Sequence, residues 1–132
     1  MNVIVDTSVW SYALRRRRSQ EHPSVGVLQQ LVVDGQVRIL GCIRQEILSG
    51  IRSPQFRLLR DQLRAFPDEV LESKDYERAA EFFNTCRQKG IQGSNTDFLI
   101  CAVAVNRDYS ILTADQDFRE FQRVLGFKLF AF

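Results

Sequence analysis

Histidine is nearly absent from this sequence: its 132 residues include one histidine, His22, and three cysteines. His22 precedes Pro23 in a polar stretch, which argues against a histidine base and against a zinc site built from several histidines. The cysteines, Cys42, Cys86 and Cys101, are odd in number and widely spaced, with no CxxC pair. We therefore expect free thiols that act as small buried hydrophobes in a reducing compartment.

Long apolar segments are missing as well. No apolar run is long enough to cross a bilayer. The N-terminal stretch from Met1 to Asp6 lacks the basic start and extended apolar segment of a secretory signal. We expect a cytoplasmic protein with no membrane partner. The length and the hydrophobic fraction of 45% suit one compact domain over residues 1–132.

Charge is nearly balanced, and the net charge of +2 does not by itself indicate a nucleic-acid binder. Its distribution is less even, because Arg15, Arg16, Arg17 and Arg18 form an unbroken basic run. Each arginine taken alone is best interpreted as solvated surface. The planar guanidinium group nevertheless suits contacts with phosphate or carboxylate.

Apolar periodicity predicts strands that alternate with helices. Strands are expected at residues 1–5, 37–40, 70–71, 110–113 and 127–132. Helices are expected at residues 7–17, 24–33, 43–48, 54–65, 96–105 and 117–124, and in the segment after Ser73, with Ser73 and either Ser94 or Asn95 as N-caps. This alternation predicts an α/β fold, in which helices flank a mostly parallel central sheet.

Four acidic residues follow predicted strands or begin predicted helices. Asp6 ends the first strand, Glu46 lies on the helix after the second, Asp97 begins a helix, and Asp115 follows the strand at 110–113. Ligands of parallel sheets bind beyond the carboxyl ends of the strands. Carboxylates gathered there repel one another, so a hard divalent cation such as Mg²⁺ or Mn²⁺ would stabilise them. Such ions support phosphodiester hydrolysis without a protein nucleophile.

Each acid also has an ordinary structural interpretation. Asp6 could cap a helix, and Glu46 could be a solvated helix residue. Asp97 could sit in its first helical turn because the helix dipole favours a carboxylate there. Asp117, two residues after Asp115, is best interpreted as an N-cap of the last helix.

Four segments, taken together and in order, resemble the conserved blocks of PIN-domain nucleases, and in particular the VapC toxins of bacterial and archaeal toxin–antitoxin systems. They are Val3–Trp10, Gln45–Ile47, Thr96–Ala102 and Ile111–Phe118. The resemblance covers the whole chain and implies a single PIN-like domain. Cys101 departs mildly from the pattern, since these sequences often carry alanine there, and should alter packing without altering chemistry.

The resemblance also implies an activity, which is metal-dependent endoribonucleolytic cleavage of RNA by metal-activated water, as the toxin of a type II system. It makes Asp6, Glu46, Asp97 and Asp115 catalytic, metal-binding acids, Asp117 a further metal ligand, and Ser8 and Thr113 supporting residues. The implied cofactor is Mg²⁺, with Mn²⁺ as an alternative.

The partners that the resemblance implies are an RNA substrate, a VapB-type antitoxin and a second copy of the chain in a homodimer. Arg15, Arg16, Arg17 and Arg18 are candidates to contact the RNA backbone. The antitoxin would wrap a groove between the helices near residues 25–33 and 56–63, and a cation of its peptide could reach the acids.

Other functions are compatible with parts of the pattern. A haloacid-dehalogenase-type phosphatase needs an acid where Ser8 stands, and a response-regulator receiver needs a late strand-end lysine, whereas the first such lysine is Lys128. A catalytically silent PIN domain would not need acids in all four blocks. A ribosomal-RNA-processing PIN nuclease often carries extra domains or zinc segments, neither of which this sequence contains.

Overall fold

The computed structural model describes residues 1–14 and 22–132, so the basic run Arg15 to Arg18 lies outside the described residues. The described part contains seven helices and a four-stranded sheet. The strands are β1 (Val3–Val5), β2 (Val37–Arg38), β3 (Ser110–Leu112) and β4 (Lys128–Leu129). The helices are α1 (Thr7–Leu14), α2 (Pro23–Val33), α3 (Gly41–Leu48), α4 (Gln55–Leu63), α5 (Ser73–Gln88), α6 (Asn95–Arg107) and α7 (Asp117–Leu125). No helix among these residues is long and apolar enough to span a membrane.

The sheet has the strand order β2-β1-β3-β4, and every pairing in it is parallel. In the central strand, Val3, Ile4 and Val5 are each fully buried. Successive strand residues point to opposite faces, so the burial of all three means that both faces of β1 are covered. The predicted α/β class and parallel sheet are confirmed.

The chain reverses its direction across the sheet between β1 and β3. From β1 it moves to β2 on one side, and it then crosses back to β3 on the other side. The two strands pair in register from Val3 with Ser110 to Val5 with Leu112. Their carboxyl ends are therefore adjacent, and they form the switch point at which ligands of parallel sheets bind.

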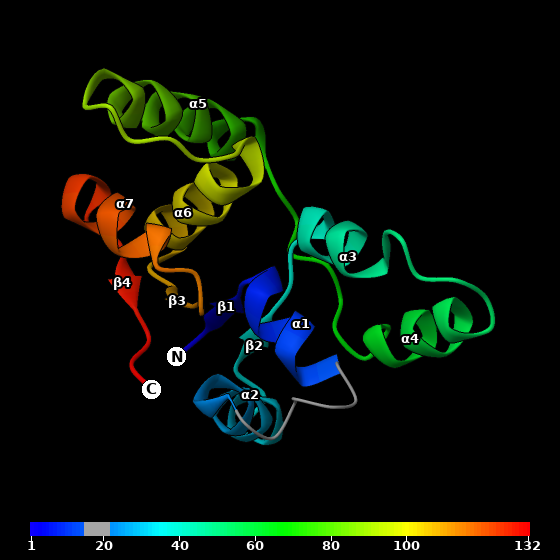
Figure 1. Ribbon diagram of the computed structural model, residues 1–132. Coiled ribbons are helices and arrows are strands. Elements are labelled where there is room, and N and C mark those ends of the chain that lie inside the picture. The colour runs from blue at the N-terminus through cyan, green and yellow to red at the C-terminus, as the bar shows by residue number, and fades with distance from the viewer. Residues whose placement is uncertain (15–21) are drawn as a thin grey trace.

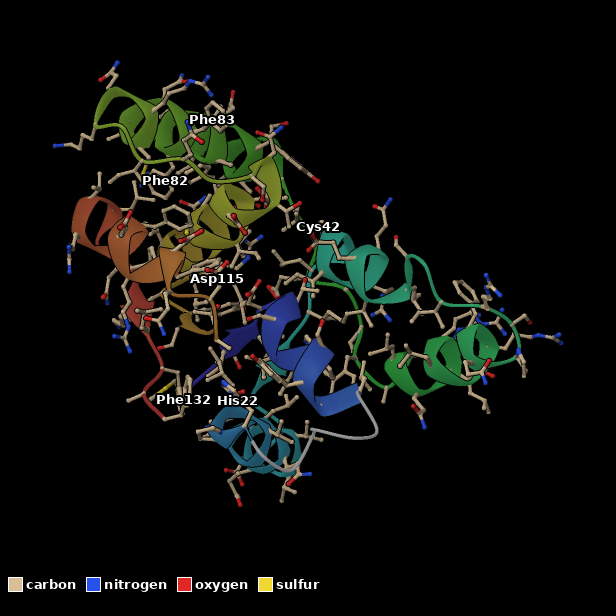
Figure 2. All side chains as sticks on the ribbon, in the orientation of Figure 1. His22, Cys42, Phe82, Phe83, Asp115 and Phe132 are labelled. Atoms are coloured by element: carbon tan, nitrogen blue, oxygen red, sulfur yellow. The ribbon has the colours of Figure 1, made fainter. Side chains whose placement is uncertain are left out.

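Helices gather in two groups around the sheet (Figure 1). Helices α5, α6 and α7 lie near β3 and β4, whereas α1 to α4 lie toward β1 and β2, with α4 beyond α3. Aromatic rings fill the first group: Phe83 of α5 meets Phe98 of α6 edge-on at 5.7 Å between centroids (Figure 2), and Phe98 lies 5.0 Å from Phe121 of α7. This aromatic core holds α6 against its neighbours.

The strand predicted at residues 70–71 is wrong. Val70 is 81% exposed, and its carbonyl oxygen accepts a hydrogen bond from the Arg107 guanidinium at 2.7 Å. The segment contributes only an isolated bridge between Ile39 and Asp68. The Arg107 side chain of α6 thus takes up the carbonyl oxygen with which a neighbouring strand would pair. Strand propensity alone cannot indicate such a contact.

Smaller corrections concern element ends and one cysteine. Ser73 is the first residue of α5 and not its cap, because Glu72 is the N-cap. The last strand is limited to Lys128–Leu129 within the predicted residues 127–132. All three cysteines are free, as predicted, but Cys42 is only half-buried (Figure 2), whereas the other two are buried.

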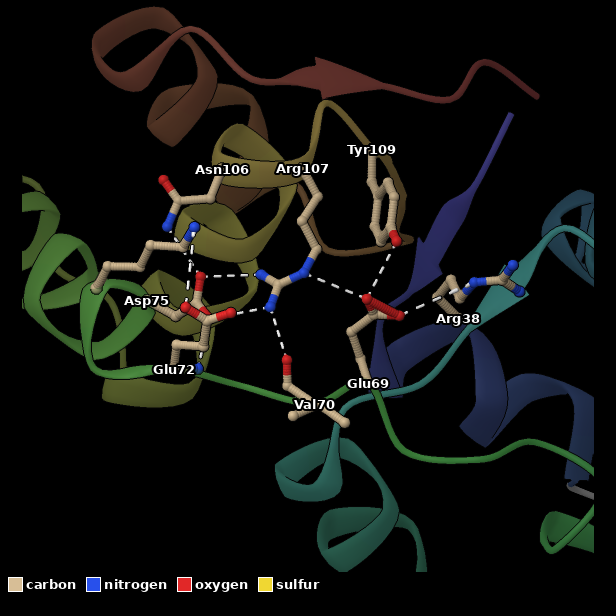
Figure 3. A network of polar contacts seen from close by, with 9 residues as sticks. Arg38, Glu69, Val70, Glu72, Asp75, Asn106, Arg107 and Tyr109 are labelled. Atoms are coloured by element: carbon tan, nitrogen blue, oxygen red, sulfur yellow. Dashed lines mark hydrogen bonds and ion pairs between the residues drawn. The ribbon is translucent and has the colours of Figure 1, made fainter.

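A buried ion pair anchors the far end of α6 (Figure 3). Asp75 of α5 is fully buried, and the Arg107 Nη1 atom donates to its Oδ1 atom at 2.9 Å. Asn106 and the backbone N–H of Glu72 donate to the same carboxylate. Burial alone would raise the pKa of Asp75, but the hydrogen bonds from Arg107, Asn106 and Glu72 overcome it and hold this pKa well below its usual range.

Replacing Asp75 by Asn should destabilise the protein by about 3–5 kcal/mol at neutral pH, because it leaves the charge of Arg107 without its buried partner. Since the pKa of Asp75 is lowered on folding, its contribution is present above the unfolded pKa of about 3.9 and is lost as the pH falls below it. Urea unfolding at several pH values should therefore show the difference shrinking below about pH 4.

The matched control is Asp61→Asn, which removes the same charge from an exposed ion pair on α4 with Arg60 and Arg64. Exposed pairs contribute less than about 1 kcal/mol, so this variant should unfold near the wild-type midpoint. An equally small decrease in the free energy of unfolding in both variants would show that the buried pair does not anchor α6.

Candidate active site

Asp6 stands where β1 ends and α1 begins, and it is 6% exposed. Its backbone N–H donates to the Leu112 carbonyl at 2.9 Å, which continues the β1–β3 pairing past the last strand residue. Its Oδ2 atom accepts hydrogen bonds from Ser8 Oγ at 2.7 Å and from Thr113 Oγ1 at 2.9 Å. Two hydroxyl groups from opposite sides of the switch point therefore hold one carboxylate.

The protons of these hydroxyl groups can be assigned. Ser8 Oγ accepts from the Ala114 N–H at 3.0 Å, and Thr113 Oγ1 accepts from the Asp115 N–H at 3.0 Å. Each hydroxyl has one proton, which it donates to Asp6, so the 3.4 Å contact between Ser8 and Thr113 carries no proton of its own. The Oδ1 atom of Asp6 accepts no hydrogen bond from the described part of the chain. It is the free oxygen of this carboxylate.

Asp97 lies in the first turn of α6, where it forms a capping box with Ser94, one of the two residues predicted as the N-cap. Ser94 Oγ accepts from the Asp97 N–H, and Asp97 Oδ2 accepts from the Ser94 N–H, both at 3.1 Å. The preceding Gly93 packs so closely on aromatic rings that a Cβ atom there would lie 2.7 Å from Phe121 and 2.9 Å from Phe98. The capping box and this close packing together determine where Asp97 lies.

The electrostatic environment of Asp97 links three of the acids. Burial raises the pKa of Asp97, hydrogen bonds from Ser94 oppose this increase, and the charges of Asp6 and Asp115 raise the pKa further. Behind them, burial and the charges of Asp97, Cys86 and Asp6 raise the pKa of the Cys101 thiol well above its usual value. The charges of Asp6 and Asp115 therefore act on Asp97 in a partly desolvated region.

Asp115 follows β3 and accepts hydrogen bonds from the first residues of the last helix. Its Oδ1 atom accepts from the Asp117 N–H at 2.9 Å, and its carbonyl accepts from the Phe118 N–H. Asp117 is therefore the first residue of α7, with Gln116 as the N-cap residue, which corrects the interpretation of Asp117 as the cap. The Asp117 side chain is exposed, and no hydrogen bond or ion pair within the described residues ties it to the other acids.

Glu46 reaches the site by a separate contact. It lies on the exposed side of α3, and its Oε1 atom accepts a hydrogen bond from Thr7 Oγ1 at 2.7 Å. Since Thr7 directly follows Asp6, this contact brings the α3 acid to the edge of the cluster. Burial, and then the charge of Glu46, raise the pKa of the neighbouring Cys42 to about 11. No sequence pattern indicates the role of Thr7, because the contact joins residues far apart in the chain.

The structure thus brings Asp6, Asp97 and Asp115 together, with Ser8 and Thr113 between the strand ends, and it connects Glu46 through Thr7. Within residues 1–14 and 22–132, no three histidine, cysteine, aspartate or glutamate side chains lie close enough together to hold a metal ion in the present side-chain positions. In this arrangement Asp97, Asp115 and Glu46 each accept a hydrogen bond from the chain through one carboxylate oxygen.

A cavity of about 590 Å³ lies beside Glu46, between α1, α3 and α4. Its walls include the apolar side chains of Leu14, Ile51 and Leu58, which are 40%, 38% and 65% exposed. No residue of α2 lines it, so it differs from the antitoxin groove that the resemblance implies between residues 25–33 and 56–63, which stays a prediction. The cavity and that groove share only their α4 part.

Comparison with known proteins adds a family and a set of similar folds. The family model of the PIN domain matches residues 3–124. The chain matches no curated protein by sequence. Among solved structures, VapBC2 from Rickettsia felis bound to a DNA fragment from its promoter has a TM-score of 0.79 at 20% identity, over 100% of this chain and 99% of that chain.

Two further structures have similar folds. FitAcB from Neisseria gonorrhoeae has a TM-score of 0.77 at 17% identity, over 98% of this chain and 96% of that chain. VapBC-1 from nontypeable Haemophilus influenzae has a TM-score of 0.75 at 16% identity, over 98% of this chain and 97% of that chain. At these identities the likeness concerns the fold.

Replacing Asp97 by Asn should raise the stability of the protein in EDTA at neutral pH. The pKa of Asp97 is raised on folding, so its ionised form is less stable in the folded chain than in the unfolded chain. Asn keeps the oxygen that accepts from Ser94 and removes the charge. A higher urea midpoint is the expected result, with the difference vanishing in acid. The exposed Asp117→Asn is the control and should stay near wild type; a lower midpoint for Asp97→Asn would contradict the repulsion.

Proposed function

The chain belongs to the PIN domain family, and we propose that it is a metal-dependent endoribonuclease that acts as the toxin of a type II toxin–antitoxin system. The observation that carries the proposal is the convergence of Asp6, Asp97 and Asp115 at the carboxyl ends of β1 and β3. The similarity of the fold to VapBC and FitAB proteins supports the toxin assignment.

The acids suit a hard divalent ion, Mg²⁺ or Mn²⁺, because all of their donor atoms are carboxylate oxygens. Asp6 offers its free Oδ1 atom while Ser8 and Thr113 hold Oδ2. Asp97 and Asp115 would be the other principal ligands, with Glu46 and Asp117 at the edge. A divalent ion bound here orients a phosphodiester, lowers the pKa of a water molecule and stabilises charge on the leaving oxygen.

The residues of the chain then have distinct tasks. Ser8 and Thr113 fix the orientation of Asp6, as hydrogen-bonding partners of metal ligands generally do. Thr7 fixes Glu46 at the edge of the site. The carboxylates repel the phosphates of RNA unless a cation lies between the acids and the RNA. Catalysis should therefore depend entirely on the ion. Arg15 to Arg18 remain candidates for contacts with RNA phosphates.

Replacing Asp6 by Asn should abolish RNA cleavage while the fold is retained, because Asn preserves the shape of the side chain and removes its charge. The test incubates purified wild type and variant with a mixed RNA pool in Mg²⁺, in Mn²⁺ and in EDTA. We expect cleavage by the wild type in either metal, none in EDTA, and a decrease of at least about a hundredfold in the variant.

The matched control is Asp108→Asn, an exposed acid after α6 in the left-handed conformation that Asn tolerates. It removes the same charge away from the cluster and should cleave like the wild type. Cleavage that survives EDTA, or equal cleavage by the wild type and Asp6→Asn, would contradict the proposed mechanism.

We propose further that a VapB-type antitoxin occupies the cavity between α1, α3 and α4. Its exposed apolar walls suit an apolar peptide segment, and Glu46 on its edge suits a cation of the same segment. A peptide bound there would extend from the cavity to the acids and would neutralise them. Inhibition would then follow from occupation of the metal site and from exclusion of RNA.

Replacing Leu58 by Arg should prevent binding of the antitoxin, because it places a charge on the apolar wall of the cavity. The measurement is co-purification of the tagged chain with a co-expressed VapB-type antitoxin. Val33→Arg is the matched control, since Val33 is a 78% exposed residue of α2 outside the cavity. Retention of the complex by Leu58→Arg, or its loss in Val33→Arg alone, would contradict this assignment.

A further inference from the structure

A second cavity, of about 350 Å³, has Asp115 in its wall. It lies between the loop after β3, the start of α7, the chain after β4 and the start of α2. Its walls include Asp115, Arg119, His22 and Phe132. The volume lies within the range of small-ligand pockets. Because Asp115 lines it, anything bound there adjoins the proposed metal site.

One wall of this cavity is aromatic and held in place. The His22 ring stacks on Tyr12 at 4.0 Å between centroids and 14° between planes. Its Nδ1 atom accepts from the Ser24 N–H as the cap of α2, so the ring cannot turn freely. Phe132 lies 5.8 Å from His22 and is 53% exposed; Figure 2 shows the two side by side below Asp115. An exposed phenyl ring beside a fixed imidazole forms a surface on which a base can stack.

The opposite wall carries a cation. Arg119 lies in the first turns of α7 and is exposed, and its guanidinium group forms no ion pair with any acid of residues 1–14 and 22–132. A guanidinium group in this position suits bidentate hydrogen bonding to a phosphate. One cavity thus combines a stacking surface for a base, a cation for a phosphate, and contact with an acid of the proposed active site.

We propose that this cavity binds the nucleotide of the RNA strand next to the phosphate that is cleaved. Its base stacks against Phe132 and His22, and its phosphate binds Arg119. The inference rests on the proposed nuclease function, because it names the part of the site that positions the substrate. It makes Arg119 and Phe132 positioning residues, with a stronger effect on substrate binding than on the chemical step.

The first test does not depend on cleavage. Isotope-labelled protein in Mg²⁺, which offsets the repulsion of a phosphate by the neighbouring acids, is titrated with each nucleoside 5′-monophosphate and with ribose 5-phosphate, and the backbone amide shifts are followed by NMR. We expect shifts within residues 113–119 and 129–132, and nucleotide binding that is about 5- to 150-fold tighter than that of ribose 5-phosphate, as stacking of one base on an aromatic side chain gives. Shifts confined to other residues, or equal affinity for ribose 5-phosphate, would overturn the proposal.

Variants separate the two walls. Phe132→Ala should remove the preference for a nucleotide over ribose 5-phosphate, and Phe132→Tyr, which keeps the ring, should restore it. Arg119→Ala should weaken both ligands by the same factor. Arg123→Ala is the matched control, because it removes an exposed arginine of the same helix that does not line the cavity. A Phe132→Ala variant that keeps the preference, or an Arg123→Ala variant as weak as Arg119→Ala, would overturn the assignment.

Cleavage kinetics distinguish this proposal from the function on which it rests. If the wild type cleaves RNA, Arg119→Ala and Phe132→Ala should raise KM and leave kcat nearly unchanged; wild-type KM values in both would overturn the nucleotide site and leave the nuclease standing. Nucleotide binding in the cavity by a wild-type protein that cleaves no RNA in either metal would support the nucleotide site and contradict the nuclease.

Discussion

The parallel pairing of β1 with β3 is the constraint on which the rest of the site depends. It continues past the strand ends through the hydrogen bond from the Asp6 N–H to the Leu112 carbonyl. This bond sets Asp6 beside Thr113, so that hydroxyl groups from both chain segments converge on one carboxylate oxygen. A shift of one residue in this register would turn the side chains to opposite faces and separate the acid from its donors.

The ionised form of Asp97 at this junction opposes folding, and other parts of the molecule compensate. Asp97 is destabilised in its ionised form by burial and by two neighbouring carboxylates. The helix that carries it is held at this end by its capping box with Ser94 and by aromatic packing around Phe98. At its other end, the buried pair of Arg107 and Asp75 ties it to α5. Helix α6 therefore holds Asp97 in place against the repulsion of the neighbouring carboxylates. Such a loss of stability at a functional site is a common compromise.

Local patterns in the sequence predicted most of the fold and the main features of the site. A buried run before Asp6, an N-cap at Ser94 or Asn95 and a strand before Asp115 are short-range signals; the run and the strand are confirmed, and Ser94 is the N-cap. Asp117 and Ser73 were predicted as N-caps, but each is the first residue of its helix, and the N-cap is the residue before it. Element ends depend on individual hydrogen bonds, such as that from the Asp117 N–H to Asp115, which composition does not determine.

Contacts between distant residues were beyond the reach of sequence patterns. Residues 70–71 are apolar, yet Arg107 takes the backbone oxygen that a strand there would have used. Thr7 and Glu46 meet although no motif links them. His22 seemed an isolated polar residue, and only the folded chain shows that it lines a cavity with Phe132 and Asp115. These contacts are set by tertiary packing, which local periodicity does not encode.

The proposed function requires the acids at the ends of β1 and β3 to bind a divalent cation. Anomalous X-ray scattering from crystals of the protein soaked in Mn²⁺ tests this binding. We expect a manganese peak at the Oδ1 atom of Asp6, with carboxylate oxygens of Asp97 and Asp115 among its ligands. A peak confined to other acids, or no peak at Asp6 at saturating Mn²⁺, would contradict the proposed function.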